Sequence, residues 1–210
     1  MKPLILIGGG GHCKSLIDVA ESAGYRIAGI LDRPEELGKK ILNYEVIGND
    51  DDIPKYVGSA EFIISVGYIR NPDLRIKLYE LVKQQGGQFA TLIASTAYVS
   101  QYASLGEGTV VMHHAFVNAE ATVGKNVILN TFSNIEHGSI VGDQCHISTG
   151  VMVNGDCKVG NNCFIGSGSV LYNGVSITDG VVVSAGSVVR RPISIKGVYS
   201  GNPAGLKIRG

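Results

Sequence analysis

Val, Ile and Leu recur at every sixth position through the second half of the chain. The sixteen positions reached in steps of six from Val99 to Val189 are all Val, Ile or Leu, although these residues hold only roughly a quarter of positions in ordinary proteins. A second row, four residues after each of these from Ala103 to Ser187, holds only small or β-branched residues. A period of six is typical of a parallel β-helix built from hexapeptide repeats. We therefore expect one short strand and one bend per hexad, three hexads per triangular coil and about five coils, with both rows turned inward.

The first 95 residues instead alternate between apolar runs of strand length and segments with helical spacing. This spacing predicts strands at 3–7, 26–31, 61–66 and 89–93, and helices at 14–23 and 71–85, with a polar connection from 32 to 46. Such alternation predicts a small Rossmann-like parallel sheet in an α/β domain. The expected organisation is an α/β domain over 1–95 followed by a parallel β-helix domain with a C-terminal tail over 96–210.

Ligands of parallel α/β sheets bind beyond the carboxyl ends of the strands. A run of four glycines, Gly8 to Gly11, follows the first strand, and Asp32 follows the second, where it suits a ribose hydroxyl. The residues expected to contact a ligand at this edge are Gly10, Gly11, His12, Asp32, Arg33 and Gly67. The full G-x-G-x-x-G pattern is not met, which argues against a whole dinucleotide, and a tight turn without a ligand remains the alternative.

Composition excludes several classes of function. Eighteen basic and eighteen acidic residues in 210 give no electrostatic case for nucleic acid or for a membrane surface. The residues from Met1 to Ile7 resemble neither a signal peptide nor a membrane span, so we expect a cytoplasmic protein. Cys145, Cys157 and Cys163 fall in the inward row and are expected to be free buried thiols, although Cys145 and Cys163 stand one coil apart, where a disulfide is conceivable. No cluster has metal-ligand spacing, so no metal is expected.

The whole chain resembles a known family. The segments LILIGGGGHCKSLIDVA, GILD, VIG and SVG, followed by hexapeptide repeats that contain NTFSNIEH, are similar to the nucleotide-sugar and sialic-acid acetyltransferases. The resemblance implies that the β-helix is left-handed and binds acetyl-CoA, that the α/β domain binds a nucleotide sugar, and that the protein is a homotrimer with sites shared between subunits. His113, His114 and Phe116 are then candidates for either the subunit contact or plain surface.

Acyl transfer requires a base for the attacking amine or hydroxyl and donors for the oxyanion. His137 and His146 fall outside both inward rows, so we expect them on the outer faces. The resemblance implies that His137 is the general base, that His146 lies near the thioester carbonyl and that Asn130 helps to orient the sugar. Glu136 should point away from the imidazole, because neighbours on a strand point to opposite faces.

Acetyl-CoA is expected along an outer groove beyond His146. The family pattern carries over to Gly155, Ser167 and Ala185, and to Pro203 in the GNPA segment of the tail. Two positions depart from the pattern. Gly138 stands where some members of the family carry a carboxylate, and Gly205 where a basic residue is usual, so that Lys207 or Arg209 would have to replace that charge.

The predicted function is acetyl-CoA-dependent N-acetylation of a nucleotide-linked amino sugar of the 4-amino-4,6-dideoxy type, in bacterial surface glycan biosynthesis. One alternative is O-acetylation of sialic acid or a related sugar, because a histidine base does not distinguish an amine from a hydroxyl. A second alternative is a trimeric sugar-nucleotide-binding scaffold without catalytic activity.

Overall fold

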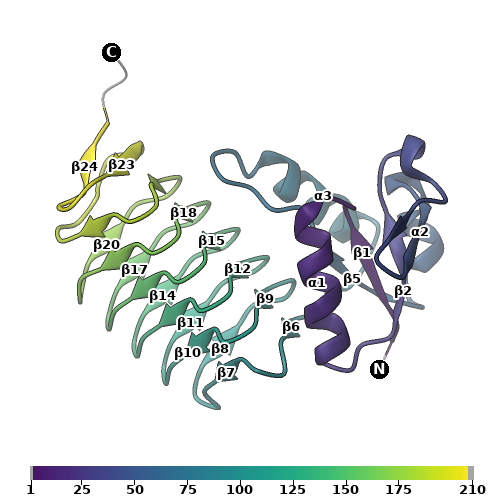
Figure 1. The fold of residues 1–210 in the computed structure, drawn as a ribbon, viewed down its shortest axis with the longest axis horizontal. Helices are drawn as coiled ribbons and strands as arrows, with labels where there is room; N and C mark the ends of the chain where they lie inside the picture. Colours follow the sequence, from purple (N-terminus) through teal and green to yellow (C-terminus); the bar gives the residue numbers. More distant parts are fainter. Residues whose placement is uncertain (1, 208–210) are drawn as a thin grey trace. The chain divides into compact units, whose positions relative to one another are not determined.

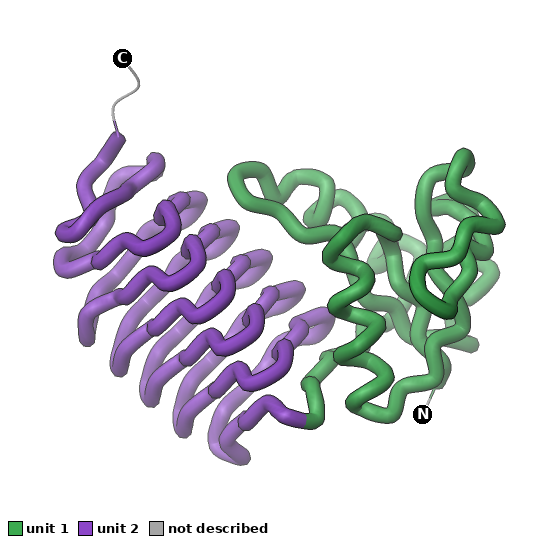
Figure 2. Tube along the Cα trace, in the orientation of Figure 1, with its two compact units in different colours: residues 1–95 green, residues 96–210 purple. Residues whose placement is uncertain are grey.

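The computed structural model describes residues 2–207 and divides the chain into two compact units, residues 1–95 and residues 96–210 (Figure 2). Residues 1 and 208–210, and with them Arg209, lie outside the described residues. Within residues 2–207, no helix has the length and apolar character needed to cross a membrane.

The first unit is a five-stranded sheet flanked by helices (Figure 1). Its elements are β1 (Leu4–Ile7), α1 (Gly11–Ser22), β2 (Ile27–Leu31), the 3-10 helix η1 (Pro34–Glu36), β3 (Lys40–Ile41), β4 (Tyr44–Gly48), the 3-10 helix η2 (Asp50–Asp52), α2 (Ile53–Tyr56), β5 (Glu61–Ile64), α3 (Asp73–Gln84) and β6 (Leu92–Ile93). The strand order is β3-β4-β2-β1-β5, parallel except for the β3–β4 hairpin. The order reverses beside β1, and such a reversal is where open α/β sheets bind ligands.

Both faces of this sheet are covered, because every residue of β1 is buried. Leu16, Ile17, Val19 and Ala20 of α1 are fully buried, as expected for the apolar stripe of a helix that packs on a sheet. The second face packs Phe62 and its neighbours against α3. The carboxyl ends of β1, β2 and β5 are therefore fixed by apolar packing on both faces of the sheet.

Three local predictions for this unit were incomplete. Helix α1 begins at Gly11, three residues before the predicted start. The segment 32–46 contains β3 and the start of β4, which form a hairpin whose turn places Leu42 at a φ of 52°. The predicted strand at 89–93 was wrong in extent, because only β6 is a strand and Phe89 makes an isolated bridge with Phe62. The Phe89 ring stacks on Tyr79 of α3 at 4.6 Å, so this residue both pairs with β5 and packs on the helix.

The second unit is a left-handed parallel β-helix whose sixteen two-residue strands, β7 to β22, form three faces (Figure 1). The first face consists of β7 (Tyr98–Val99), β10 (Phe116–Val117), β13 (Asn134–Ile135), β16 (Met152–Val153), β19 (Val170–Leu171) and β22 (Val188–Val189). The second face consists of β8 (Ser104–Leu105), β11 (Thr122–Val123), β14 (Ile140–Val141), β17 (Lys158–Val159) and β20 (Ser176–Ile177). The third face includes β9 (Val110–Val111), β12 (Ile128–Leu129), β15 (His146–Ile147), β18 (Phe164–Ile165), β21 (Val182–Val183) and β23 (Val198–Ser200).

Each strand from β7 to β19 pairs in register with the strand eighteen residues later, as Asn134 does with Met152. One coil is therefore three hexads. We call the turns that join the first face to the second face the first edge. The turns that join the second face to the third face are the second edge. The turns that join the third face back to the first face are the third edge.

Both predicted inward rows are buried except in the first coil, where Val99, Ala103 and Leu105 are partly exposed, and this part of the prediction is confirmed. Val111, Ile135 and Leu171 of the aliphatic row are 0% exposed. Buried hydroxyls of the small row donate to main-chain carbonyls, as Ser139 Oγ does to Asn154 O at 2.8 Å, with the exception of Ser133. None of the four cysteines of the chain forms a disulfide, and all four are buried.

A third row with the same period lies at the corners. Fourteen positions in steps of six from 108 to 186 all have a positive φ. Seven of them are glycines, and the others are His114, Glu120, Asn126, Phe132, Gln144, Asp156 and Asn162. The left-handed conformation turns the chain sharply after each strand, and it is uncommon for an aromatic residue such as Phe132.

The second edge explains the glycines that follow the aliphatic row. Asp143 Oδ1 accepts from Lys125 N, and Asn161 Oδ1 accepts from Asp143 N, both at 2.8 Å and each one coil apart. A Cβ added at Gly142 would lie 2.6 Å from Asn161 Oδ1. Glycine at this position therefore leaves space for the side chain that caps the neighbouring coil.

The tail folds back on the last coil as a hairpin of β23 with β24 (Gly205–Leu206). Ala204 N donates to Val188 O at 2.8 Å, and Val188 N donates to Gly201 O at 3.0 Å. The turn that contains Pro203 is thereby fixed on β22.

Candidate functional site

The glycine loop after β1 is shaped by close contacts with the end of β5. Gly8 has a φ of 103°, which favours glycine, and its carbonyl accepts from Ser65 Oγ at 2.5 Å. The His12 ring lies over Gly67, where a Cβ would be 3.5 Å from its Cγ. The structure therefore brings His12 and Gly67 together at the start of α1. Gly10 is the N-cap residue of α1 and Gly11 its first residue, where main-chain N–H groups suit a phosphate.

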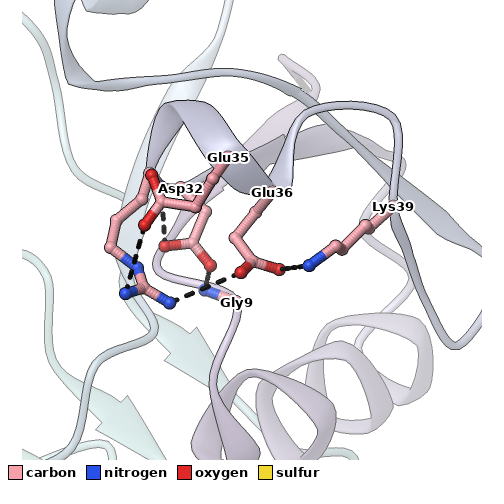
Figure 3. Close-up of polar contacts among 6 residues, drawn as sticks. Gly9, Asp32, Glu35, Glu36 and Lys39 are labelled. Carbon is pink, nitrogen blue, oxygen red and sulfur yellow. Dashed lines mark hydrogen bonds and ion pairs between the residues drawn. The ribbon is translucent and has the colours of Figure 1, made fainter.

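Asp32 joins the ends of β1 and β2. Its Oδ2 accepts from Gly9 N at 2.9 Å and its Oδ1 accepts from Arg33 N at 2.8 Å (Figure 3). A Cβ added at Gly9 would lie 2.5 Å from Asp32 Oδ2, so only glycine allows this approach. The carboxylate is held in place and retains lone pairs for a ligand hydroxyl.

A cavity of about 410 Å³ opens beside these residues. It is lined by Ile7, Gly8, Leu31, Asp32, Arg33, Pro34, Asn49, Asp50, Asp51, Val66, Leu74 and Leu78. The predicted residues Asp32 and Arg33 belong to this lining, whereas Gly10, Gly11, His12 and Gly67 do not. Sequence reasoning missed Asn49, Asp50 and Asp51, which follow β4 in a segment it assigned no strand.

The charges around the cavity are mixed. Burial raises the pKa of Asp50, Lys77 opposes this shift, and the carboxylates of Asp51 and Asp32 add to it. The Arg33 guanidinium lies at the exposed rim and pairs with Glu35 at 3.3 Å and Glu36 at 3.4 Å (Figure 3). In this arrangement Arg33 is turned to its own segment, and it would have to leave both carboxylates to contact a phosphate.

His137 lies exposed at the first edge, in the turn after β13. Its ring covers Gly155, the position one coil later, where a Cβ would be 2.7 Å from Cε1 and 2.8 Å from Nε2. The next residue, Gly138, has a φ of 65°, and a Cβ there would collide with Asp156 Oδ1. A carboxylate from the following coil thus lies at Gly138, which itself carries no side chain.

His146 occupies a different place. It projects from β15 on the third face, yet it is only 8% exposed, because the Phe164 ring packs edge-on at 5.2 Å. Asn130 Nδ2 lies 3.2 Å from His146 Nε2. Asn130 Oδ1 accepts from Thr131 N at 2.8 Å, which fixes the orientation of the amide. His146 therefore lies on an outer face, as predicted, but is covered.

The remaining residues predicted to bind acetyl-CoA divide between two edges. Ser167 and Ala185 lie at the third edge, where Ser148 Oγ and Ser167 Oγ are 2.8 Å apart and Gly166 allows the approach of Ala185 N. Pro203 lies in the tail turn on β22, the strand that follows that edge. Gly155 lies at the first edge with His137, so the structure does not bring it together with Ser167 within one chain.

The first face and the corner beside it carry exposed aromatic pairs. Phe116 stacks on Tyr98 at 4.9 Å, and His114 stacks on Phe132 at 4.9 Å. His113 Nδ1 is 2.8 Å from Thr96 Oγ1. Among residues 2–207, no three His, Cys, Asp or Glu side chains are grouped to hold a metal ion.

The β-helix is built from hexapeptide repeats, and the comparisons with known proteins place these repeats in a class of transferases. Residues 156–191 match the family model described as bacterial transferase hexapeptide (six repeats), and residues 3–82 match the PglD N-terminal domain.

Solved structures extend the match over the whole chain. PerB from Caulobacter crescentus, in complex with CoA and GDP-perosamine, is 30% identical over 99% of this chain and 98% of that chain, with a TM-score of 0.91. The acetyltransferase domain of PglB from Neisseria gonorrhoeae is 27% identical over 99% of this chain and 100% of that chain, with a TM-score of 0.90, and has also been solved with acetyl coenzyme A. The chain therefore belongs to the hexapeptide-repeat sugar acetyltransferases that include the nucleotide-amino-sugar N-acetyltransferases. The predicted family, fold class and acetyl-CoA-dependent enzyme class are confirmed.

A curated relative shares only part of the chain. The uncharacterized protein L142 of Acanthamoeba polyphaga mimivirus is 32% identical over 109 residues, which are 52% of this chain and 21% of that protein. The chain thus matches about a fifth of the length of this relative, whose description adds nothing about activity.

Proposed function

We propose that this protein transfers the acetyl group of acetyl-CoA to the amine of a nucleotide-linked sugar of the 4-amino-4,6-dideoxy type. The observation that carries the proposal is the match over the whole chain to PerB, whose structure contains CoA and GDP-perosamine. The product serves bacterial surface glycan synthesis, and the enzyme works in the cytoplasm.

The nucleotide binds to the first unit, in the cavity beyond β1 and β2. Asp32 accepts from ribose hydroxyls, because its two bound N–H groups leave further lone pairs on the carboxylate. The pyrophosphate lies at Gly10, Gly11 and His12, where the first turn of α1 presents N–H groups. An apolar wall for the nucleobase is formed by Leu31, Pro34 and Leu74.

His137 acts as the general base. It accepts the proton of the sugar amine as the nitrogen attacks the thioester carbonyl, and the thiolate of CoA leaves from the tetrahedral intermediate. Its exposed ring is accessible to a substrate and is held against Gly155, so little freedom is lost when the substrate binds.

His146 and Asn130 hold the thioester. The Asn130 amide donates to Nε2 of His146, which leaves Nδ1 as the protonated nitrogen of the neutral ring. The family pattern implies that this ring lies near the thioester carbonyl, where a donor stabilises the oxyanion. Ser167, Ala185 and Pro203 contact the CoA chain along the third edge, and the backbone at Gly155 contacts it from the first edge.

This assignment calls for residues from two chains, and a homotrimer supplies them. His137 lies at the first edge and His146 beside the third edge. The first face separates these two edges, and its width is one hexad, which spans about 20 Å as extended chain. If three copies turn their first faces to a common axis, the first edge of each copy meets the third edge of the next. The first face suits such a contact because Tyr98, Phe116 and Met152 are 54%, 37% and 37% exposed on it.

The test is thiol release from acetyl-CoA by the pure protein, offered 4-amino sugar nucleotides linked to uridine, thymidine or guanosine, beside free sialic acid. Turnover on one amino sugar nucleotide is expected. Turnover on sialic acid alone would replace the proposal with O-acetylation. If no substrate turns over and the protein does not bind acetyl-CoA, the result would favour a scaffold without catalytic activity. Light scattering that gives a monomer under assay conditions would contradict the shared site.

A further inference from the structure

Two arginines follow the last strand of the first face. Arg190 and Arg191 come directly after β22, at the first edge, and both side chains are exposed. The Arg190 guanidinium lies over the Tyr172 ring at 5.4 Å, so it is stacked on the preceding coil. Unlike Arg33, neither arginine takes part in any of the ion pairs formed among residues 2–207. Both cations are therefore available to an anionic ligand.

The two arginines lie on the same edge as His137. The strands β13, β16, β19 and β22 pair in register, so the turn with the arginines lies three coils beyond the turn with His137. Neighbouring coils are about 4.8 Å apart, which places the arginines about 14 Å from His137 along the helix axis. The turns between them contain Gly155, under the imidazole, and Gly174, where a Cβ would meet no atom within 4 Å. These two glycines leave room for a ligand along the edge.

The tail turn is fixed on the strand that leads to the arginines. Val188 of β22 donates its N–H to Gly201 O at 3.0 Å and accepts from Ala204 N at 2.8 Å. Arg190 follows Val188 by two residues on the same strand end. Pro203, which is proposed to contact the CoA chain, is therefore held close to the arginines in the same part of the β-helix.

CoA carries its charge at a set distance from its thioester. The pyrophosphate and the 3′-phosphate are ionised at neutral pH. Equal numbers of basic and acidic residues give this chain no net charge, so the cations for these groups have to be supplied locally. The arm between the thioester sulfur and the pyrophosphate is as long as about four amino-acid residues, which span roughly 14 Å when extended. This length matches the separation of His137 and the arginines.

We propose that Arg190 and Arg191 bind the pyrophosphate of acetyl-CoA, with the Tyr172 ring holding Arg190 in position. This inference rests on the proposed function, in which the thioester meets His137 at the first edge. Guanidinium groups suit this ligand because their planar N–H donors pair with two phosphate oxygens at once. Lys207, which was expected to supply the charge, instead follows β24 in the sheet of the third face, where its main-chain N–H donates to Val198 O.

The experiment compares wild type, R190A and R191A on acetyl donors that share one thioester. With acetyl-CoA, each variant should raise KM about tenfold and keep kcat within about twofold, because the phosphate contact is the same before and during the reaction. With S-acetylpantetheine, which has no phosphate, kcat/KM should agree with wild type within about twofold. Acetyl-dephospho-CoA keeps the pyrophosphate, so it should show the same loss as acetyl-CoA.

Calorimetric titration with CoA provides a readout without turnover. R190A and R191A should weaken CoA binding by the same factor of about ten, and binding of pantetheine should not change. Y172A keeps both charges but removes the ring under Arg190, so it should weaken CoA binding only about two- to threefold. K125A is the matched control, since it removes an exposed cation from the second edge and should change neither binding nor KM.

The two proposals fail in different ways. If wild type turns over and both arginine variants keep the wild-type KM and affinity for CoA, the inference is wrong and the proposed function stands. Equal losses with S-acetylpantetheine, a loss confined to donors with the 3′-phosphate, or a loss in K207A alone would also overturn the assignment to the pyrophosphate. If wild type neither binds CoA nor acetylates an amino sugar nucleotide, both are wrong. R190Q and R191Q, which keep much of the side-chain stem, replace any alanine variant that does not fold.

Discussion

Asn130 donates a side-chain N–H to Nε2 of His146 across 3.2 Å, and this contact selects one tautomer of the neutral imidazole. The selection follows because Asn130 Oδ1 already accepts from Thr131 N, so the amide cannot turn. The nitrogen left protonated is Nδ1. A residue expected from the resemblance to orient a sugar is thus placed to orient a second histidine.

We predict that N130A and N130D lower kcat by about tenfold, because His146 loses its preferred tautomer in the first variant and is forced to the other in the second. Steady-state kinetics and nitrogen chemical shifts of His146 provide the measurement. N130A that is fully active, with unchanged nitrogen shifts, would show that Asn130 does not govern the tautomer.

The contact of His137 with Gly155 leads to a second prediction. H137A should remain a folded trimer that binds acetyl-CoA, with kcat lower by a factor on the order of 10² or more. G155A should lose about tenfold in kcat while the base remains, because the added Cβ would lie 2.7 Å from Cε1 of the ring and displace it.

The matched control for G155A is G174A, which is at the same edge and places its Cβ within 4 Å of no other atom. G174A should keep wild-type kinetics and lose only stability, because its φ is 70°. Near-normal kcat in both H137A and G155A would remove His137 from the role of base.

The fold was predictable from sequence because each hexad repeats one local requirement. An aliphatic residue at Val111 or Ile135 is buried by the coils on either side, and the same burial recurs along the whole helix, so the period records the architecture directly. The handedness of the β-helix was implied by the resemblance alone. The general preference for right-handed crossovers would predict right-handed coils.

The site was less predictable because its geometry depends on side chains one coil apart. The spacing predicts that Asn118 and Glu136 occupy equivalent positions on neighbouring coils, but it does not predict the 2.6 Å hydrogen bond between their side chains. Asn49 and Asp50 were missed for a different reason: β4 follows a hairpin turn with Leu42 in the left-handed region, and such a turn carries no signal in a polar segment. Local patterns thus predicted the scaffold, and lateral contacts determine the chemistry.

The cap at the second edge predicts a change in stability. G142A should destabilise the β-helix by about 2–3 kcal/mol, because its Cβ would lie 2.6 Å from Asn161 Oδ1 and 2.8 Å from Asn161 N. Calorimetry should show the β-helix transition lowered by roughly 5–10 °C. G174A, with open space around its Cβ, provides the comparison, and an equal loss in both variants would mean that the cap contributes nothing specific.

The last prediction concerns pH and the cavity of the first unit. Because burial raises the pKa of Asp50 in the folded protein, the folded state binds more protons than the unfolded state between the ordinary pKa of 3.8 and the raised value. Stability contributed by this group is therefore lost as pH rises through that window, and the buried charge is unfavourable at neutral pH. D50N should raise the melting temperature of the first unit at pH 7, by roughly 1 °C, and the advantage should disappear below about pH 4.

Asp51 provides the control, because it lines the same cavity and is exposed. D51N removes the same formal charge from the same wall, so a general relief of repulsion would stabilise both variants alike at every pH above 4. A stabilising effect in D50N that is larger at pH 7 than at pH 4, with a smaller effect in D51N, would assign the penalty to burial of the Asp50 carboxylate. If D50N is instead less stable than wild type at pH 7, then the ionised carboxylate of Asp50 makes a favourable contact in the folded protein. The charge of Asp50 would then stabilise the first unit even without a ligand in the cavity.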